Sequence, residues 1–113
     1  MRVLDGEQVL VRIFIGESSK WQGESLRKAL LERLKTEGFA GATAFHATAG
    51  FGARSIMHTA SILRLSEDLP VLIEVVDTKE KINALMPILD EMISGGMVTM
   101  ENVRVLKYGP RSD

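Results

Sequence analysis

Four segments of the chain have the apolar, β-branched character of strands, and a polar or charged residue interrupts each of them. The segments are 9–15, 43–48, 71–76 and 103–108, and the interrupting residues are Arg12, His46, Glu74 and Arg104. A parallel strand that helices cover on both faces is apolar at nearly every position. The interruptions therefore indicate a sheet with one face turned toward solvent or toward another subunit.

Two helices with one apolar face are predicted between these segments. Ser18 or Ser19 is expected to cap the first helix, which runs to about Glu37 and stops at Gly38. Asp77-Thr78 is expected to cap the second, which ends near Gly95-Gly96 and contains Pro87, where a kink is expected. The apolar residues recur at helical spacing, at Leu26, Ala29, Leu30 and Leu34, and at Ile82, Leu85, Met86, Leu89 and Ile93.

This order of elements permits two architectures, and residues 54–65 separate them. If they form a helix, strands and helices alternate throughout and a small parallel flavodoxin-like sheet results. If they form a loop or hairpin, the chain is an α+β, ferredoxin-like βαββαβ sandwich with a long loop between the second and third strands. Ile56, Ala60 and Leu63 fit a helix face, so periodicity leaves both open. The polar interruptions favour the ferredoxin-like fold. A short extended piece at 98–100 is expected before the last strand.

Length, charge and cysteine content limit the classes of function. The chain has 113 residues, the length of one domain. It holds 14 basic against 15 acidic residues, a balance that argues against a nucleic-acid or anionic-membrane partner. It has no cysteine, which excludes disulfides and thiolate chemistry. No apolar run reaches membrane-spanning length and no signal-peptide pattern is present, so a cytoplasmic location is expected.

The segment GFGARS at 50–55 permits three interpretations. It resembles the start of a dinucleotide-binding fingerprint, with Asp77 as the ribose acid, but Ser55 replaces the third glycine. Its glycines also suit a turn that needs positive φ. In the third interpretation the glycine N–H groups and Arg54 hold phosphate while Phe51 covers an apolar part of a ligand.

No catalytic or metal-binding set stands out. His46 and His58 are the only histidines, 12 residues apart, and a metal site needs more ligands than they offer. Glu67 and Asp68 are adjacent and precede Pro70, which is typical of a solvated turn rather than of an acid–base pair.

Three stretches resemble a known family. They are GATAFHATAGFGARSIMHTASILRLSEDLPVLIEVVD at 41–77, RIFIGES near the start and LDEMISGGMVTMENVRVLKY near the end. Together they are similar to an uncharacterised bacterial and archaeal family, domain of unknown function 190, over nearly the whole chain. That family resembles the nitrogen-regulatory PII proteins in fold. The resemblance implies a single PII-like domain over residues 1–113, a homotrimer, and an adenine nucleotide as ligand in a cleft between subunits. It also implies a loop that engages a protein partner such as a membrane transporter.

The resemblance also implies ligand-binding positions. Gly50, Gly52 and Arg54 would form the base of the long loop, and Gly95-Gly96 a glycine turn that meets the nucleotide. Arg104 and Lys107 would be basic residues that reach a neighbour's ligand. The chain departs from PII proteins in two places. Met97 stands where they have a phosphate-binding lysine, which puts triphosphate binding in doubt, and the loop lacks their modified tyrosine, since the only tyrosine is Tyr108.

Two functions are expected from these residues. The first is a PII-like signalling or ligand-sensing protein that binds a small anionic ligand and regulates a partner through residues 50–70. The alternative is a small enzyme acting on a nucleotide-like substrate in the same cleft, with Arg54, His58 and Arg64 as substrate contacts. No catalytic residue, metal ligand or tightly bound cofactor is assigned.

Overall fold

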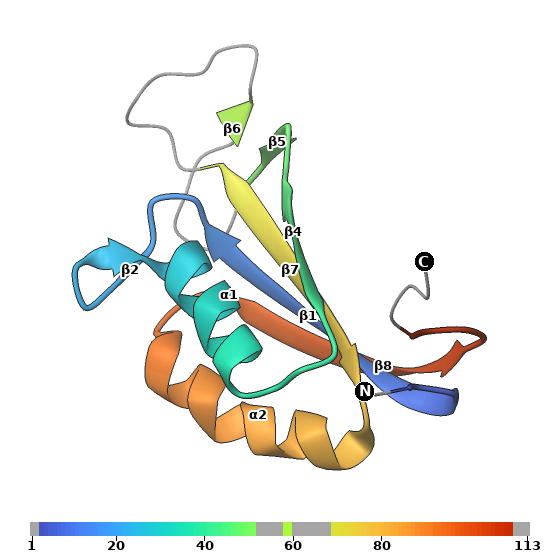
Figure 1. Ribbon diagram of the computed structural model, residues 1–113. Coiled ribbons are helices and arrows are strands. Elements are labelled where there is room, and N and C mark those ends of the chain that lie inside the picture. Colours follow the sequence, from blue (N-terminus) through green and yellow to red (C-terminus); the bar gives the residue numbers. More distant parts are fainter. Residues whose placement is uncertain (1–2, 52–57, 60–68, 110–113) are drawn as a thin grey trace.

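Two helices lie against one face of a four-stranded antiparallel sheet (Figure 1). The computed structural model describes residues 3–51, 58–59 and 69–109. The strand order is β4-β7-β1-β8 and every neighbouring pair is antiparallel. The strands of the sheet and the two helices are, in chain order, β1 Gly6–Gly16, α1 Leu26–Thr36, β4 Ala42–His46, β7 Pro70–Asp77, α2 Lys79–Met92 and β8 Met97–Val105. The ferredoxin-like prediction is confirmed, and the parallel flavodoxin-like sheet is excluded.

The core lies between the sheet and the helices, and the period of two along the strands determines which residues fill it. In β1, Val11 and Ile13 are fully buried on the helix side, and Ile73 and Val75 of β7 lie beside them in register. The helices contribute their predicted apolar stripes, which include Leu30 and Leu85, both fully buried. Pro70 is the first residue of β7, where its missing N–H is tolerated.

The first helix begins later than predicted. Residues 20–25 form a short hairpin, β2 Lys20–Trp21 with β3 Glu24–Ser25, whose turn holds Gln22 at φ 50° and Gly23 at φ 84°. Ser25, not Ser18 or Ser19, is the N-cap, and its Oγ accepts from the N–H of Lys28. The expected start at Ser18 or Ser19 is wrong because the Gln-Gly turn folds this stretch into a hairpin first.

The predicted end of α1 and the predicted start of α2 are confirmed, whereas α2 ends at Met92, before the expected Gly95-Gly96. The N–H groups of Gly38 and Phe39 donate to the carbonyls of Lys35 and Leu34, which closes α1 in a Schellman motif. Thr78 caps α2, where its Oγ1 accepts from the N–H of Lys81. Pro87 lies inside α2.

The last strand differs from the prediction in both bounds. It is one element, Met97–Val105, rather than a short piece at 98–100 followed by a strand at 103–108. It pairs with β1 continuously from Phe14↔Met97 to Gly6↔Val105. Polar residues within it obscure the strand pattern, because β8 is an edge strand whose side chains are mostly exposed. The second strand likewise spans 42–46 rather than 43–48.

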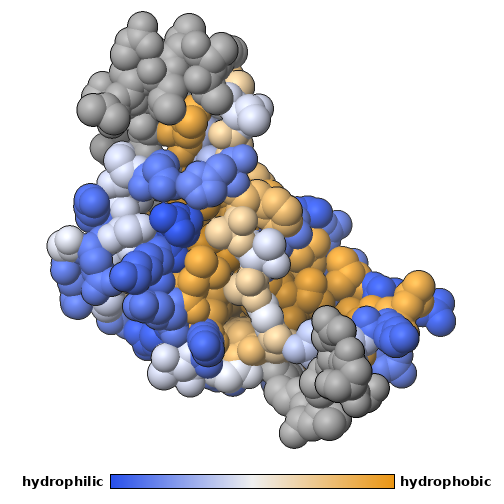
Figure 2. Space-filling view, turned by 45° about the horizontal axis from the view of Figure 1, so that its top comes forward, coloured by the Kyte–Doolittle hydropathy of each residue, from blue (hydrophilic) through white to orange (hydrophobic). Residues whose placement is uncertain are grey.

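The face of the sheet away from the helices, here called the open face, is partly apolar. Register and alternation place Phe14, Leu72, Phe45 and Met97 on it, with Phe45 and Met97 about half exposed. Figure 2 shows apolar side chains gathered across the middle of the visible side, with hydrophilic side chains on its left. Arg12 and Glu74, two of the four predicted interruptions, lie on the open face. Alternation places His46 and Arg104 on the other face, at exposed positions.

Candidate functional site

One end of the sheet carries the base of the segment from 50 to 70. Gly16 pairs with Pro70 there, and the N–H groups of Glu17 and Ala47 donate to the carbonyls of Leu69 and Pro70, both at 2.9 Å. β5 Ala49–Gly50 pairs with β6 His58–Thr59. A Cβ added to Gly50 would come within 2.8 Å of Cγ of Pro70, so this position requires glycine for close approach.

Several predicted site residues of this segment lie outside the part that the structure describes. These are Gly52, Arg54 and Arg64, together with the side chain of His58. Phe51 is described and is 67% exposed. The conformation expected for residues 54–65 therefore remains a prediction, except that 58–59 form a strand pair with 49–50.

The second predicted glycine turn lies at the same end of the sheet. Gly96 has φ 128°, and a Cβ added to it would come within 2.4 Å of the carbonyl oxygen of Phe14, two residues before Gly16. Gly95 and Gly96 line a shallow hollow of about 190 Å³ with Ser94, Asp90 and three apolar side chains. Among its lining residues there is one carboxylate and no basic side chain, so the hollow does not favour a highly charged phosphate chain.

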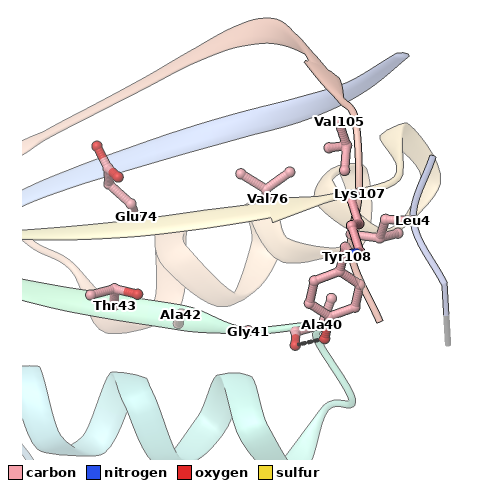
Figure 3. A pocket seen from close by; sticks show the side chains of 10 residues that line it. All are labelled: Leu4, Ala40, Gly41, Ala42, Thr43, Glu74, Val76, Val105, Lys107 and Tyr108. Carbon is pink, nitrogen blue, oxygen red and sulfur yellow. Dashed lines mark hydrogen bonds between the residues drawn. The ribbon is translucent and has the colours of Figure 1, made fainter. Parts of the chain in front are cut away.

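A larger cavity of about 430 Å³ extends from the middle of the sheet to its opposite end (Figure 3). One wall is the turn that enters β4, the floor is β7, and the far wall comes from the two terminal segments. Its lining residues are Leu4, Ala40, Gly41, Ala42, Thr43, Glu74, Val76, Val105, Lys107 and Tyr108. Nine of these ten residues were absent from the predicted site, because they come from four segments that are distant in sequence. Lys107 was the one predicted site residue among them, and the polar Glu74 inside a strand had indicated only an open sheet face.

The turn at Ala40 is held from both sides. Its N–H donates to Oδ2 of Asp77 at 2.9 Å, and its carbonyl accepts from the hydroxyl of Tyr108. Asp77 is fully buried, and its Oδ1 accepts from the N–H of Thr78 at 2.7 Å. The Asp77 carboxylate thus accepts hydrogen bonds from two backbone N–H groups and is not exposed to a ligand. This excludes the interpretation of Asp77 as the ribose-binding acid of a dinucleotide site.

The two predicted basic residues lie near the end of the sheet that is far from the glycine turns. Lys107 lines the cavity, whereas Arg104 lies on the other face of β8, in register with Glu7. The pairs Phe14↔Met97 and Gly6↔Val105 are eight residues apart on β1, roughly 27 Å at about 3.4 Å per residue. Within one chain, Gly50 and Gly96 therefore lie nearly the full length of the sheet away from Lys107.

A charged cluster lies between the two ends, on the open face. Arg12 Nε is 3.0 Å from Oε2 of Glu74, and its Nη1 is 2.5 Å from Oε1 of Glu101. These hydrogen bonds, first that of Glu74 and then that of Glu101, raise the pKa of Arg12. Arg12, Glu74 and Glu101 together carry one positive and two negative charges. Because Glu74 also lines the large cavity, this cluster places a net negative charge beside the cavity.

Glu17 contacts the side chains of both His46 and Arg27. His46 Nδ1 lies 3.4 Å from Oε1 of Glu17, and Arg27 Nε lies 3.6 Å from the same oxygen. Within residues 3–51, 58–59 and 69–109, no group of three or more His, Asp or Glu is arranged to hold a metal ion. Neither helix in these ranges has the length and apolar character that crossing a membrane requires.

Three solved structures share this fold. A PII-like signalling protein of Thermus thermophilus superposes with a TM-score of 0.63 at 23% identity and covers 94% of each chain. CPII, a nitrogen regulatory PII-like protein of Thiomonas intermedia bound to ADP, AMP and bicarbonate, gives 0.64 at 14% identity, covering 93% of this chain and 99% of the other. CPII bound to ADP and bicarbonate gives 0.58 at 16% identity, with 92% and 91% covered. At these identities the likeness concerns the fold alone.

Sequence relatives are closer. A UPF0166 protein of Aquifex aeolicus is 38% identical over 109 residues, covering 94% of this chain and 98% of the relative. A UPF0166 protein of Methanocaldococcus jannaschii is 37% identical over 99 residues, covering 87% and 91%. The model of domain of unknown function 190, described as Uncharacterized ACR, matches residues 8–105. The chain therefore belongs to the family of domain of unknown function 190, and its fold is PII-like.

Proposed function

We propose that the protein is a cytoplasmic, PII-like ligand sensor that binds an adenine nucleotide between subunits of a homotrimer and regulates a protein partner through residues 50–70. The observation that carries this proposal is the cavity of about 430 Å³ between the β4 turn and the terminal segments. Its volume falls within the usual range for small-molecule sites.

The chemistry of the cavity wall suits a nucleoside. Leu4, Val76 and Val105 offer apolar surface for a planar ring. Glu74, an acceptor, and Thr43, both donor and acceptor, are partners in register and can bind ring amino and ribose hydroxyl groups. Lys107 stands at the same cavity and supplies a positive charge for a first phosphate.

A second subunit would complete the site. Within one chain the glycine turns proposed for the phosphates lie roughly 27 Å along the strands from the Val105–Lys107 end of the cavity, too far for the phosphates of one nucleotide to contact both Lys107 and these turns. A neighbouring copy that packs on the open face can bring its own Gly50 and Gly96 to this chain's cavity. The half-exposed Phe45 and Met97 support such an interface, because soluble monomers seldom expose a large apolar patch.

The hollow beside Gly95 and Gly96 favours a ligand with few phosphate groups. Asp90 lines it and Met97 follows Gly96, so the described part of the phosphate side offers little positive charge. We therefore expect AMP or ADP to bind in preference to ATP. The Thiomonas protein of the same fold was solved with ADP, AMP and bicarbonate, which supports the choice of ligands to test.

Thermal unfolding of the purified protein with AMP, ADP, ATP, inorganic phosphate, bicarbonate and divalent metals tests this proposal. A ligand that prefers the native state raises the melting temperature by mass action, and a hundredfold excess over Kd contributes about 2.7 kcal/mol. AMP or ADP should raise the melting temperature, and Arg54→Ala should abolish that rise. Arg33→Ala is the control, because Arg33 lies on the surface of α1 and pairs with Glu37, and it should leave the rise unchanged. No rise with either nucleotide would contradict the proposal. Loss of intact nucleotide on long incubation would instead favour the enzyme.

The proposed switch is the segment 50–70, whose base is joined to the sheet through Glu17, Leu69 and Pro70. Ligand bound beside Gly50 would change the conformation that this segment presents to a partner protein, such as a membrane transporter. Limited proteolysis with and without ADP tests this step, and equal cleavage within 50–70 in both samples would contradict it.

A further inference from the structure

The last described residues form a strap beside the large cavity. β8 ends at Val105, and Leu106–Gly109 continue without strand pairing. The strap, defined as residues 106–109, supplies Lys107 and Tyr108 to the cavity wall. Leu106 is 80% exposed, so it contributes little anchoring.

One hydrogen bond joins this strap to the opposite wall. The hydroxyl of Tyr108 donates to the carbonyl of Ala40, and Figure 3 shows the Tyr108 ring reaching from the strap to the turn at Ala40. The acceptor is rigidly held, because the N–H of the same residue donates to the fully buried Asp77. The ring therefore closes one side of the cavity against a fixed point of the core.

We propose that Tyr108 is a latch: its hydrogen bond to Ala40 holds the strap closed over the cavity, and its release opens the way for ligand to enter and leave. This inference rests on the proposed function for the identity of the ligand, but not for the latch itself. A neutral hydrogen bond contributes little net free energy in water, so a strap without strand pairing opens readily. The remaining walls of the cavity are strands, the turn at Ala40 and the buried Leu4 of the N-terminal segment, so the strap is the part of the wall that is free of strand pairing and of burial.

The kinetic test compares Tyr108→Phe with the wild type. The substitution keeps the ring and removes the hydroxyl, so the dissociation rate of a fluorescent ADP analogue should rise about fivefold, and its association rate should rise as well. Leu106→Ala, on the same strap but outside the cavity lining, is the matched control and should leave both rates unchanged. Equal rates in Tyr108→Phe and wild type would overturn the latch as a gate.

A second test needs no ligand. Tyr108 is the only tyrosine, so protein labelled with 3-fluorotyrosine reports on this one ring by fluorine NMR. A latched ring should resonate away from the position found in the urea-unfolded chain, and a resonance at the unfolded position in the native protein would overturn the latch. Failure of ADP to bind the wild type would count against the nucleotide proposal, while the fluorine resonance still decides for or against the latch.

Discussion

Gly96 lies so close to the carbonyl oxygen of Phe14 that a Cβ at position 96 would come within 2.4 Å of it. The contact joins the turn after α2 to the end of β1, where the base of the 50–70 segment also begins. At this point the need for glycine is a matter of space as well as of backbone conformation, since φ is 128°.

Gly96→Ala is accordingly expected to destabilise the protein by about 2 to 3 kcal/mol, through backbone strain and displacement of the β1 backbone. Gly95→Ala is the matched control, because a Cβ there meets nothing within 4 Å and the loss should be small. Urea unfolding followed by circular dichroism measures both. Equal midpoints for the two variants would show that the turn adapts without cost.

Asp77→Ala should cost about 3 kcal/mol, because it removes a fully buried carboxylate and leaves the half-buried N–H donors of Ala40 and Thr78 without their acceptor. The same change frees the turn at Ala40, so nucleotide binding should weaken as well. Glu91→Ala, an exposed carboxylate on α2, is the control and should change stability little. An Asp77→Ala protein with wild-type stability would contradict the assigned role.

Arg12→Glu should dissociate the proposed trimer, since it places three carboxylates together on the open face, with Glu74 and Glu101. Arg33→Glu is the control. It removes the ion pair of Arg33 with Glu37 on α1, whose N–O distance of 2.9 Å is close to the 3.0 Å of the Arg12–Glu74 pair, and it should leave the assembly intact. Sedimentation velocity at low and high salt measures the outcome. A trimer that survives Arg12→Glu would place the subunit interface elsewhere.

The assembly should not respond to pH through Arg12. The hydrogen bonds that Arg12 donates to Glu74 and Glu101 raise the pKa of Arg12, so its contribution is fully present below its ordinary, strongly basic pKa and is lost only as the pH rises through the raised value. Sedimentation between pH 7 and 9 should therefore show no titration of this group. Dissociation across that range would identify a different ionisable group at the interface.

Lys107→Ala should weaken ADP binding about five- to tenfold and adenosine binding much less, because the ammonium group is proposed to contact phosphate. Arg104→Ala is the informative partner variant. Arg104 lies on the other face of β8, so it affects binding only if it reaches a neighbour's ligand. Isothermal titration calorimetry of both variants tests this. Unchanged ADP affinity in both variants would show that neither Lys107 nor Arg104 contacts the ligand.

Local signals in the sequence were sufficient for most of the helices and strands. Thr78 and Gly38 marked helix ends because a cap is made by residues within a few positions of each other. Arg12 and Glu74 indicated an open sheet face, and they do pair on it. The resemblance of the 41–77 stretch to its family correctly indicated a PII-like fold.

Only the tertiary structure decided which residues share a cavity. Gly41, Glu74 and Tyr108 belong to separate segments, and register brings them together along one cavity that runs from the middle of the sheet to one end, while Gly50 and Gly96 lie at the other end. The hairpin before α1 and the continuous β8 also depend on turn geometry and on pairing with β1. The caps at Thr78 and Gly38 and the alternation along the strands are decided by neighbours along the chain and can be read from sequence, whereas strand register and cavity walls arise from non-local contacts.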